Sequence, residues 1–170
     1  RNLMPDGQVT FAFQGGEPLL IGPDFYRNFF DLAEQLGISA FYAFQTNGLC
    51  IADPDQGNEW IALFRKYHCL IGLSVDGPRN LHDTNRRTNV GTDTHDAVML
   101  AYRRLRKAGV DVNFLTVLSP EVTAHPEDLF NFYKASGISY VQLIPCLPPL
   151  QTEGTRLSGD FLITFYRLWK

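Results

Sequence analysis

The chain is poor in cysteine and has no excess of basic residues. Its 170 residues include three cysteines, Cys50, Cys69 and Cys146, which lie too far apart for a C-x-x-C or zinc motif. Their odd number argues against a disulfide framework, so we expect reduced thiols that are buried as small hydrophobic side chains. The net charge of −3 predicts no nucleic acid partner and no anionic lipid partner.

Long apolar runs and nucleotide-binding motifs are also missing. No segment approaches the roughly 20 apolar residues of a membrane span, and the first residues do not resemble a secretory leader. We therefore expect a cytoplasmic protein without a membrane partner. Neither a G-x-G-x-x-G turn nor a Walker loop follows the first β-rich segment, which disfavours dinucleotide and nucleoside triphosphate sites. An apolar content of 45% is enough to bury a core in one globular unit.

Five β-rich segments alternate with amphipathic helical segments along the chain. Their starts recur about every 30 to 40 residues, which is the spacing of βαβ units. The segments are Val9 to Phe13, Ser39 to Gln45, Leu70 to Val75, Val112 to Leu118 and Tyr140 to Ile144. This α/β pattern suits either an open doubly wound sheet or an arc of a (β/α) barrel.

Apolar residues at helical spacing predict helices between these segments, each covering one face of the sheet. The first predicted stripe comprises Phe25, Phe29, Leu32, Ala33 and Leu36, and the second comprises Ala97, Leu100, Ala101, Leu105 and Ala108. The basic cluster Arg103, Arg104, Arg106 and Lys107 is expected to form the solvated face of the second helix. Phe161 to Lys170 is also helical in pattern.

The first β-rich segment runs into Gln14-Gly15-Gly16-Glu17-Pro18, a composition typical of a ligand-holding strand tip. Adjacent glycines let the backbone approach a small molecule, and Glu17 offers an acceptor for an ammonium group. A plain βα turn is the alternative interpretation of the same residues.

Polar residues follow the other strands as well. They include Thr46 and Asn47 after the second strand, Ser74 and Asp76 at the end of the third, and Ser119 after the fourth. The carboxyl ends of parallel strands meet at one edge of a sheet, so we expect these side chains to converge on one rim. Each of these short segments is also a common turn former.

Charged and imidazole side chains elsewhere carry weaker signals. We interpret His82-Asp83 with Arg86-Arg87 as a capped, solvated turn, the alternative being a loop that supplies charge to a carboxylate or phosphate. The other histidines, His68, His95 and His125, have no ligand-like spacing. No metal ligands are predicted in this chain.

Five segments in order resemble the radical S-adenosylmethionine enzymes. They are FQGGEP from Phe13, QTNG from Gln45, GLSVDGP from Gly72, HDTNRR from His82 and QLIPCLP from Gln142. GGEP alone is shared by many radical enzymes, whereas its combination with SVDGP-x-x-x-HD is more specific. The chain most resembles the anaerobic sulfatase-maturating branch, also called arylsulfatase regulators, and the resemblance covers nearly all of it.

This resemblance implies a partial (β/α)6 TIM-like barrel, of which about five βα units are present here. In the family, a [4Fe-4S] cluster reduces S-adenosylmethionine to a radical that takes a hydrogen atom from the β-carbon of a cysteine or serine in a sulfatase. The product is formylglycine, and a reductant such as flavodoxin or ferredoxin supplies the electron. These oxidoreductases therefore take a sulfatase polypeptide as substrate.

The same resemblance implies roles for residues at the strand ends. Gly15, Gly16 and Glu17 would hold the methionine amino group, with Gln14 beside them. Ser74 would contact the ribose or carboxylate end of the cofactor, and Leu147 would pack near the adenine. The remaining motif positions around the pocket are Thr46, Asn47 and Asp76.

The cluster motif of the family, C-x-x-x-C-x-x-C, does not occur in this sequence. Cys50, Cys69 and Cys146 do not replace it, because they lie on different units and cluster ligands must be brought together. We therefore expect residues 1–170 to be the second to sixth βα units of a radical SAM core, with the cluster loop upstream and an auxiliary-cluster region downstream. Alone, this part should be inactive, and no catalytic acid or base is assigned in it.

Three other functions fit parts of the pattern. A radical enzyme acting on a different peptide would carry the same cofactor motifs. A non-catalytic regulatory or binding module could retain the fold without the cluster. An ordinary (β/α) enzyme for a phosphorylated metabolite would need phosphate-binding glycines after the late strands, and none follows Val112 to Leu118 or Tyr140 to Ile144.

Overall fold

A computed structural model describes residues 7–146 and 159–170 of the chain. Five strands form one sheet, in which the strand order β1-β2-β3-β4-β5 is that of the sequence. The strands are β1 Val9–Phe13, β2 Ala40–Thr46, β3 Leu70–Ser74, β4 Asp111–Leu118 and β5 Val141–Pro145. All five predicted strands are confirmed, with ends that differ from the predicted ones by at most one residue.

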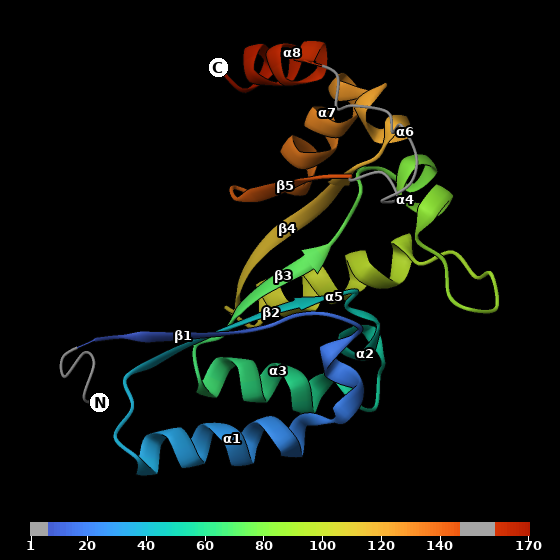
Figure 1. The fold of residues 1–170 in the computed structure, drawn as a ribbon. Coiled ribbons are helices and arrows are strands. Elements are labelled where there is room, and N and C mark those ends of the chain that lie inside the picture. The colour runs from blue at the N-terminus through green and yellow to red at the C-terminus, as the bar shows by residue number, and fades with distance from the viewer. Residues whose placement is uncertain (1–6, 147–158) are drawn as a thin grey trace, which may run out of the picture. The chain divides into compact units, whose positions relative to one another are not determined.

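Helices connect the strands (Figure 1). They are the 3-10 helix η1 Pro18–Ile21 and the α-helices α1 Pro23–Gln35, α2 Leu49–Ala52, α3 Gly57–Lys66, α4 Arg79–Asn85, α5 His95–Lys107, α6 Pro120–Thr123, α7 Pro126–Ser136 and α8 Gly159–Trp169. The helical pattern predicted for the last segment is confirmed by α8. None of the helices formed by the described residues combines the length and hydropathy that a membrane crossing requires.

The order of the strands distinguishes between the two predicted architectures. The pairs β1–β2, β2–β3 and β4–β5 are parallel. A doubly wound sheet reverses its strand order at a switch point, whereas a (β/α) barrel keeps the order of the sequence. The sequential order found here therefore favours the barrel type.

The chain divides into two compact units. The first comprises Arg1–Leu73 and Ala97–Val112, and the second comprises Ser74–Asp96 and Asn113–Lys170. The first unit thus contains β1, β2, α1, α3 and α5 from Ala97 onward. The second contains α4, α6, α7, β5 and α8.

Aromatic side chains form the core of the first unit. Figure 1 shows α1 and α3 side by side along β1 and β2, and Tyr26 of α1 lies 5.8 Å from Trp60 of α3 between ring centroids. Phe44 of β2 lies 4.8 Å from Tyr26 and 5.1 Å from Phe64. Such pairs add roughly 0.5–1.5 kcal/mol each beyond the burial of their area. The two helices are therefore held to β2 by ring contacts.

The predicted stripe of α1 is wrong in part. Ala33 is buried as expected, but the helix turns Tyr26 and Phe30 into the core, while Phe25 and Leu32 are about half exposed. Both sets recur at helical spacing on this aromatic-rich helix, so periodicity alone does not distinguish them. The second predicted stripe agrees better with the buried face of its helix, because Ala101 and Leu105 of α5 are fully buried.

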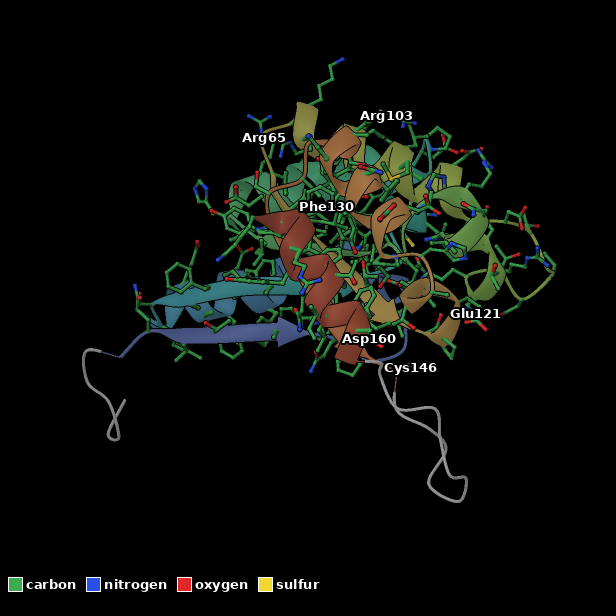
Figure 2. The ribbon with its side chains drawn as sticks, turned by 90° about the horizontal axis from the view of Figure 1, so that it is seen from above. Arg65, Arg103, Glu121, Phe130, Cys146 and Asp160 are labelled. Carbon is green, nitrogen blue, oxygen red and sulfur yellow. The ribbon has the colours of Figure 1, made fainter. Side chains whose placement is uncertain are left out.

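Aromatic contacts also organise the second unit. Phe130 of α7 lies 6.2 Å from Phe165 and 6.0 Å from Trp169, both on α8. Figure 2 shows Phe130 beside α8, with Asp160 at the beginning of that helix. Phe165 also contacts Tyr133, the buried tyrosine of α7. These contacts pack α8 against α7.

Arg104 is not the solvated side chain that its basic neighbours predict. Its guanidinium donates to the carbonyl oxygens of Ile51 (2.8 Å), Ala52 (3.2 Å) and Asp53 (2.8 Å), and to the side-chain oxygen of Asn58 (2.8 Å). Carbonyl groups at the end of a helix lack partners within it, so the guanidinium satisfies the end of α2. Arg104 thereby joins α5 to α2 within the first unit.

We predict that Arg104→Met lowers the free energy of unfolding by about 1.5–3 kcal/mol, the contribution typical of hydrogen bonds to a charged group. Arg103→Met, on the exposed neighbour in α5, is the matched control and should change stability by less than about 0.5 kcal/mol. Chemical denaturation measures both variants. Equal effects of the two substitutions would contradict the capping role.

Candidate functional site

The tip that follows β1 exposes backbone atoms that have no hydrogen-bond partner among the described residues. Gly15 and Gly16 have φ angles of +90° and +55°, the left-handed region that favours glycine. Both are exposed, and a Cβ atom at either position would meet nothing within 4 Å. Within residues 7–146 and 159–170, their amide and carbonyl groups make no hydrogen bond. The tip therefore offers backbone donors and acceptors to a ligand.

Glu17 ties this tip to the end of β2. Its Oε1 atom accepts from the amide of Leu19 (3.1 Å) and the hydroxyl of Thr46 (2.7 Å), and its Oε2 atom accepts from the amide of Asn47 (2.8 Å). Thr46 is buried, and its hydroxyl also accepts from the amide of Gly48 (3.0 Å). The carboxylate thus fixes the backbone of both strand ends.

The structure therefore brings together three of the predicted site residues, Glu17, Thr46 and Asn47. The side-chain oxygen of Asn47 accepts from the amide of Leu49 at 2.9 Å, which holds the beginning of α2. Gln14 is exposed next to the glycine pair. A direct role of these side chains in binding a ligand stays a prediction.

We predict that Glu17→Gln destabilises the protein by about 1–3 kcal/mol, because either orientation of the amide sets its NH₂ group against a backbone N–H donor. Glu34→Gln, at an exposed position of α1, is the matched control and should be close to neutral. Denaturant titration of both variants measures the difference. Wild-type stability of the Glu17→Gln variant would contradict a structural role for the hydrogen bonds of the Glu17 carboxylate.

A second polar cluster, in the second unit, surrounds Asp76. This carboxylate is 4% exposed, and its Oδ1 atom accepts from the amide of Val117 at 2.7 Å. Arg86 donates to both carboxylate oxygens, through Nε to Oδ2 and through Nη2 to Oδ1. Ser74 is half-buried, and its hydroxyl has no hydrogen-bond partner in the part of the chain that the structure describes.

The segment from His82 to Arg86 is not the solvated turn predicted for it. It lies in α4 and at its end, where His82 is 1% exposed and Asp83 is 6% exposed. The Oδ1 atom of Asp83 accepts from the amides of Thr94 (3.0 Å) and His95 (2.9 Å), and so caps the beginning of α5. The predicted capping is confirmed for Asp83, and the predicted exposure is confirmed for Arg87, which forms an ion pair with Asp93.

Residue types alone gave little signal for this buried network. A buried carboxylate requires a cationic or N–H partner, so a buried Asp76 would have pointed to an arginine nearby. The structure supplies that burial, and Arg86 is the partner. The imidazole of His82 forms hydrogen bonds with a backbone amide and a hydroxyl, and no spacing of residues in the sequence predicts such partners.

Burial lowers the pKa of His82 from 6.5 to about 4, an effect that Arg86 and His95 reinforce and the carboxylates Asp76 and Asp83 oppose. Below pH 6.5 the His82 imidazole is therefore protonated in the unfolded chain while it stays neutral in the folded chain. Stability is lost as the pH falls from about 6.5 to 4, by up to about 3 kcal/mol from this group.

We predict that His82→Asn, which keeps an acceptor near the position of Nδ1, makes the loss of stability between pH 6.5 and 5 shallower than in the wild type. Denaturation at several pH values measures the slopes. Equal slopes for the wild type and His82→Asn would contradict a neutral, buried imidazole.

The cysteines do not gather into a metal site. All three are free, with Cys69 buried, Cys50 half-buried and Cys146 exposed, so the predicted burial is confirmed only for Cys69. Burial raises the pKa of the Cys69 thiol to about 12, which disfavours the thiolate that metals bind. Among the described residues, no group of three His, Cys, Asp or Glu side chains could hold a metal ion. These residues therefore do not fit a [4Fe-4S] cluster.

One predicted site residue, Leu147, lies outside the described residues. Cys146, just before it, directly follows β5 and ends the first described range (Figure 2). The other predicted residues fall into the two clusters described above. Gln14, Gly15, Gly16, Glu17, Thr46 and Asn47 belong to the first unit, and Ser74 and Asp76 belong to the second.

Comparison with known families gives a match over most of the chain. Residues 2–133 match the Radical SAM superfamily. The chain belongs to this superfamily. Membership agrees with the sequence motifs at the ends of β1 and β3 and with the sequential strand order of the barrel type.

Within the radical SAM superfamily, the chain is similar to enzymes that mature sulfatases. It is 35% identical to the cysteine-type anaerobic sulfatase-maturating enzyme of Clostridium novyi (strain NT), over 83% of this chain and 37% of that protein. It is 32% identical to the serine-type enzyme of Klebsiella aerogenes, over 96% of this chain and 41% of that protein. The chain thus spans less than half the length of these two relatives.

Solved structures show the same fold. The structure of native anSMEcpe with bound AdoMet superposes with a TM-score of 0.88 at 30% identity, covering 96% of this chain and 47% of that one. A further similar structure is native anSMEcpe with bound AdoMet and the Cp18Cys peptide, also with a TM-score of 0.88. The fold of this chain is therefore the partial α/β barrel of the radical SAM type, as predicted.

Proposed function

We propose that this chain is the S-adenosylmethionine-binding core of a longer radical enzyme, which oxidises a cysteine or serine of a sulfatase to formylglycine. Similarity to both cysteine-type and serine-type sulfatase-maturating enzymes supports this substrate class. In this proposal the chain supplies the second to sixth βα units of the core. Other parts of the protein supply the cluster-binding cysteines and the auxiliary-cluster region.

The observation that carries the proposal is that the backbone of Gly15 and Gly16 makes no hydrogen bond with any described residue. An ammonium group needs oxygen acceptors, and the carbonyl groups of both glycines accept no hydrogen bond from the described residues. The carboxylate of Glu17, already bonded to three donors, adds negative charge beside them. We infer that the glycine backbone binds the methionine amino group, and that Glu17 acts mainly by holding that backbone in place.

Ser74 is the second proposed ligand of the cofactor. Its half-buried hydroxyl, which has no hydrogen-bond partner in the described parts of the chain, can donate to or accept from the ribose or the carboxylate end of S-adenosylmethionine. Thr46 and Asn47 would support the glycine tip, and Asp76 would support the backbone that follows Ser74, through the bonds that they already make. Gln14 beside the glycines and Leu147 near the adenine complete the proposed set.

The protein and the cofactor divide the chemistry between them. When bound and reduced, S-adenosylmethionine supplies the radical that takes a hydrogen atom from the β-carbon of the target residue. The residues of this chain bind and orient the cofactor at the strand ends. A protein reductant such as flavodoxin or ferredoxin would supply the electron.

An anaerobic turnover assay tests the proposal. The longer protein, with its cluster assembled, is incubated with reductant, S-adenosylmethionine and a sulfatase-derived peptide that carries either cysteine or serine at the target position. We expect 5'-deoxyadenosine to form together with the mass change of formylglycine in one of the two peptides. Formation of deoxyadenosine without a change in either peptide would overturn the substrate assignment. The absence of both deoxyadenosine and a peptide mass change would overturn the proposed activity.

A matched pair of glycine variants tests the binding site in the same protein. We expect Gly16→Val to abolish binding of S-adenosylmethionine, because a branched side chain would occupy the space left open at the strand tip. Gly109→Val is the control, since Gly109 also has a left-handed φ of +73° and open space around it, but follows α5. Unchanged affinity in a folded Gly16→Val protein would remove the glycine pair from the site.

A further inference from the structure

Four residues of the second unit form a closed ring of hydrogen bonds. The amide of Asp76 donates to Nδ1 of His82 (3.2 Å), so this nitrogen carries no proton and Nε2 carries one. Nε2 donates to the hydroxyl of Thr94 (3.1 Å), which donates to the carbonyl oxygen of Arg86 (2.7 Å). The guanidinium of Arg86 closes the ring on the carboxylate of Asp76.

The side chains of this ring are mostly buried. Exposed fractions are 1% for His82, 4% for Asp76 and 8% for Thr94, and the side chain of Arg86 is 26% exposed. In such surroundings hydrogen bonds are stronger than in water, and a group that loses its partner is costly. The loss of one member therefore leaves a buried donor or acceptor unpaired in its neighbours.

The ring holds one side of the chain that follows β3, and β4 holds the other side. The amide of Val75 donates to the carbonyl oxygen of Leu115 (2.9 Å), and the carbonyl oxygen of Val75 accepts from the hydroxyl of Thr116 (2.6 Å). Asp76 belongs to both attachments, because its carboxylate also accepts from Val117. Ser74 immediately precedes this doubly attached segment, and its own hydroxyl is free of partners among the described residues.

We propose that Arg86, with His82 and Thr94, positions the Ser74 hydroxyl for S-adenosylmethionine by holding the backbone from Ser74 to Asp76 in one conformation. The proposal rests on the cofactor role proposed above for Ser74. His82 and Arg86 bond to Asp76, and Thr94 bonds to both of them, so all three are positioning residues in this proposal.

A double-mutant cycle for cofactor affinity tests this role. In the longer protein with its cluster assembled, the dissociation constant of S-adenosylmethionine is measured for the wild type, Ser74→Ala, Arg86→Met and the double variant. We expect about fivefold weaker binding for Ser74→Ala and about fivefold to tenfold for Arg86→Met. If Arg86 acts through Ser74, the double variant binds no more weakly than Arg86→Met alone. Independent, multiplying losses would overturn the proposal.

Neighbouring substitutions separate positioning from general damage. Arg87→Met removes the adjacent, exposed arginine and should leave the affinity unchanged. If Arg86→Met does not fold, the same cycle is run with Thr94→Val, which deletes one hydroxyl of the ring, and Thr94→Ser should restore the affinity. A folded Thr94→Val protein with wild-type affinity would overturn the role of the ring.

The same data distinguish this proposal from the proposed function. A wild-type protein that does not bind S-adenosylmethionine would remove the function, and the positioning role with it. Binding that is weakened by Ser74→Ala and unaffected by Arg86→Met would remove the positioning role alone. Binding unaffected by both substitutions would remove Ser74 from the site and leave the superfamily membership intact.

Discussion

A carboxylate that follows one strand and accepts the backbone amide of the next is the interaction on which both polar clusters depend. Glu17, after β1, accepts from the amide of Asn47 at the end of β2, at 2.8 Å. Asp76, after β3, accepts from the amide of Val117 in β4, at 2.7 Å. A charged acceptor makes each bond stronger than a neutral one. Segments that would otherwise behave as mobile loops are thereby held to the sheet.

The two carboxylates differ in how their charge is balanced. Glu17 is bonded to two amides and one hydroxyl, with no cation among its hydrogen-bond partners in the described residues. Asp76 is more deeply buried and carries a two-point bond from Arg86. The difference suits their proposed tasks, because an ammonium group beside Gly15 and Gly16 would find uncompensated negative charge at Glu17. The charge of Asp76 is already balanced by Arg86, so its carboxylate acts by holding the backbone.

Much of the fold could be predicted from alternating β-rich and helical segments, as the strand from Val9 to Phe13 illustrates. The buried face of α1 could not, because Phe25 and Tyr26 begin two overlapping apolar stripes on the same helix. The strand tips could be located from Gly15, Glu17 and Ser74, which follow or end strands. The roles of Arg104 and His82 could not be predicted, because their partners are mainly backbone groups, which leave no pattern of residue types in the sequence.

The main proposal is that S-adenosylmethionine takes the Gly15–Gly16 backbone and the Ser74 hydroxyl as ligands. A crystal structure of the longer protein with S-adenosylmethionine bound tests it most directly. The account predicts the methionine ammonium group within hydrogen-bond distance of a glycine carbonyl oxygen, and the Ser74 hydroxyl on the ribose or the carboxylate. A cofactor bound away from both strand tips would contradict it.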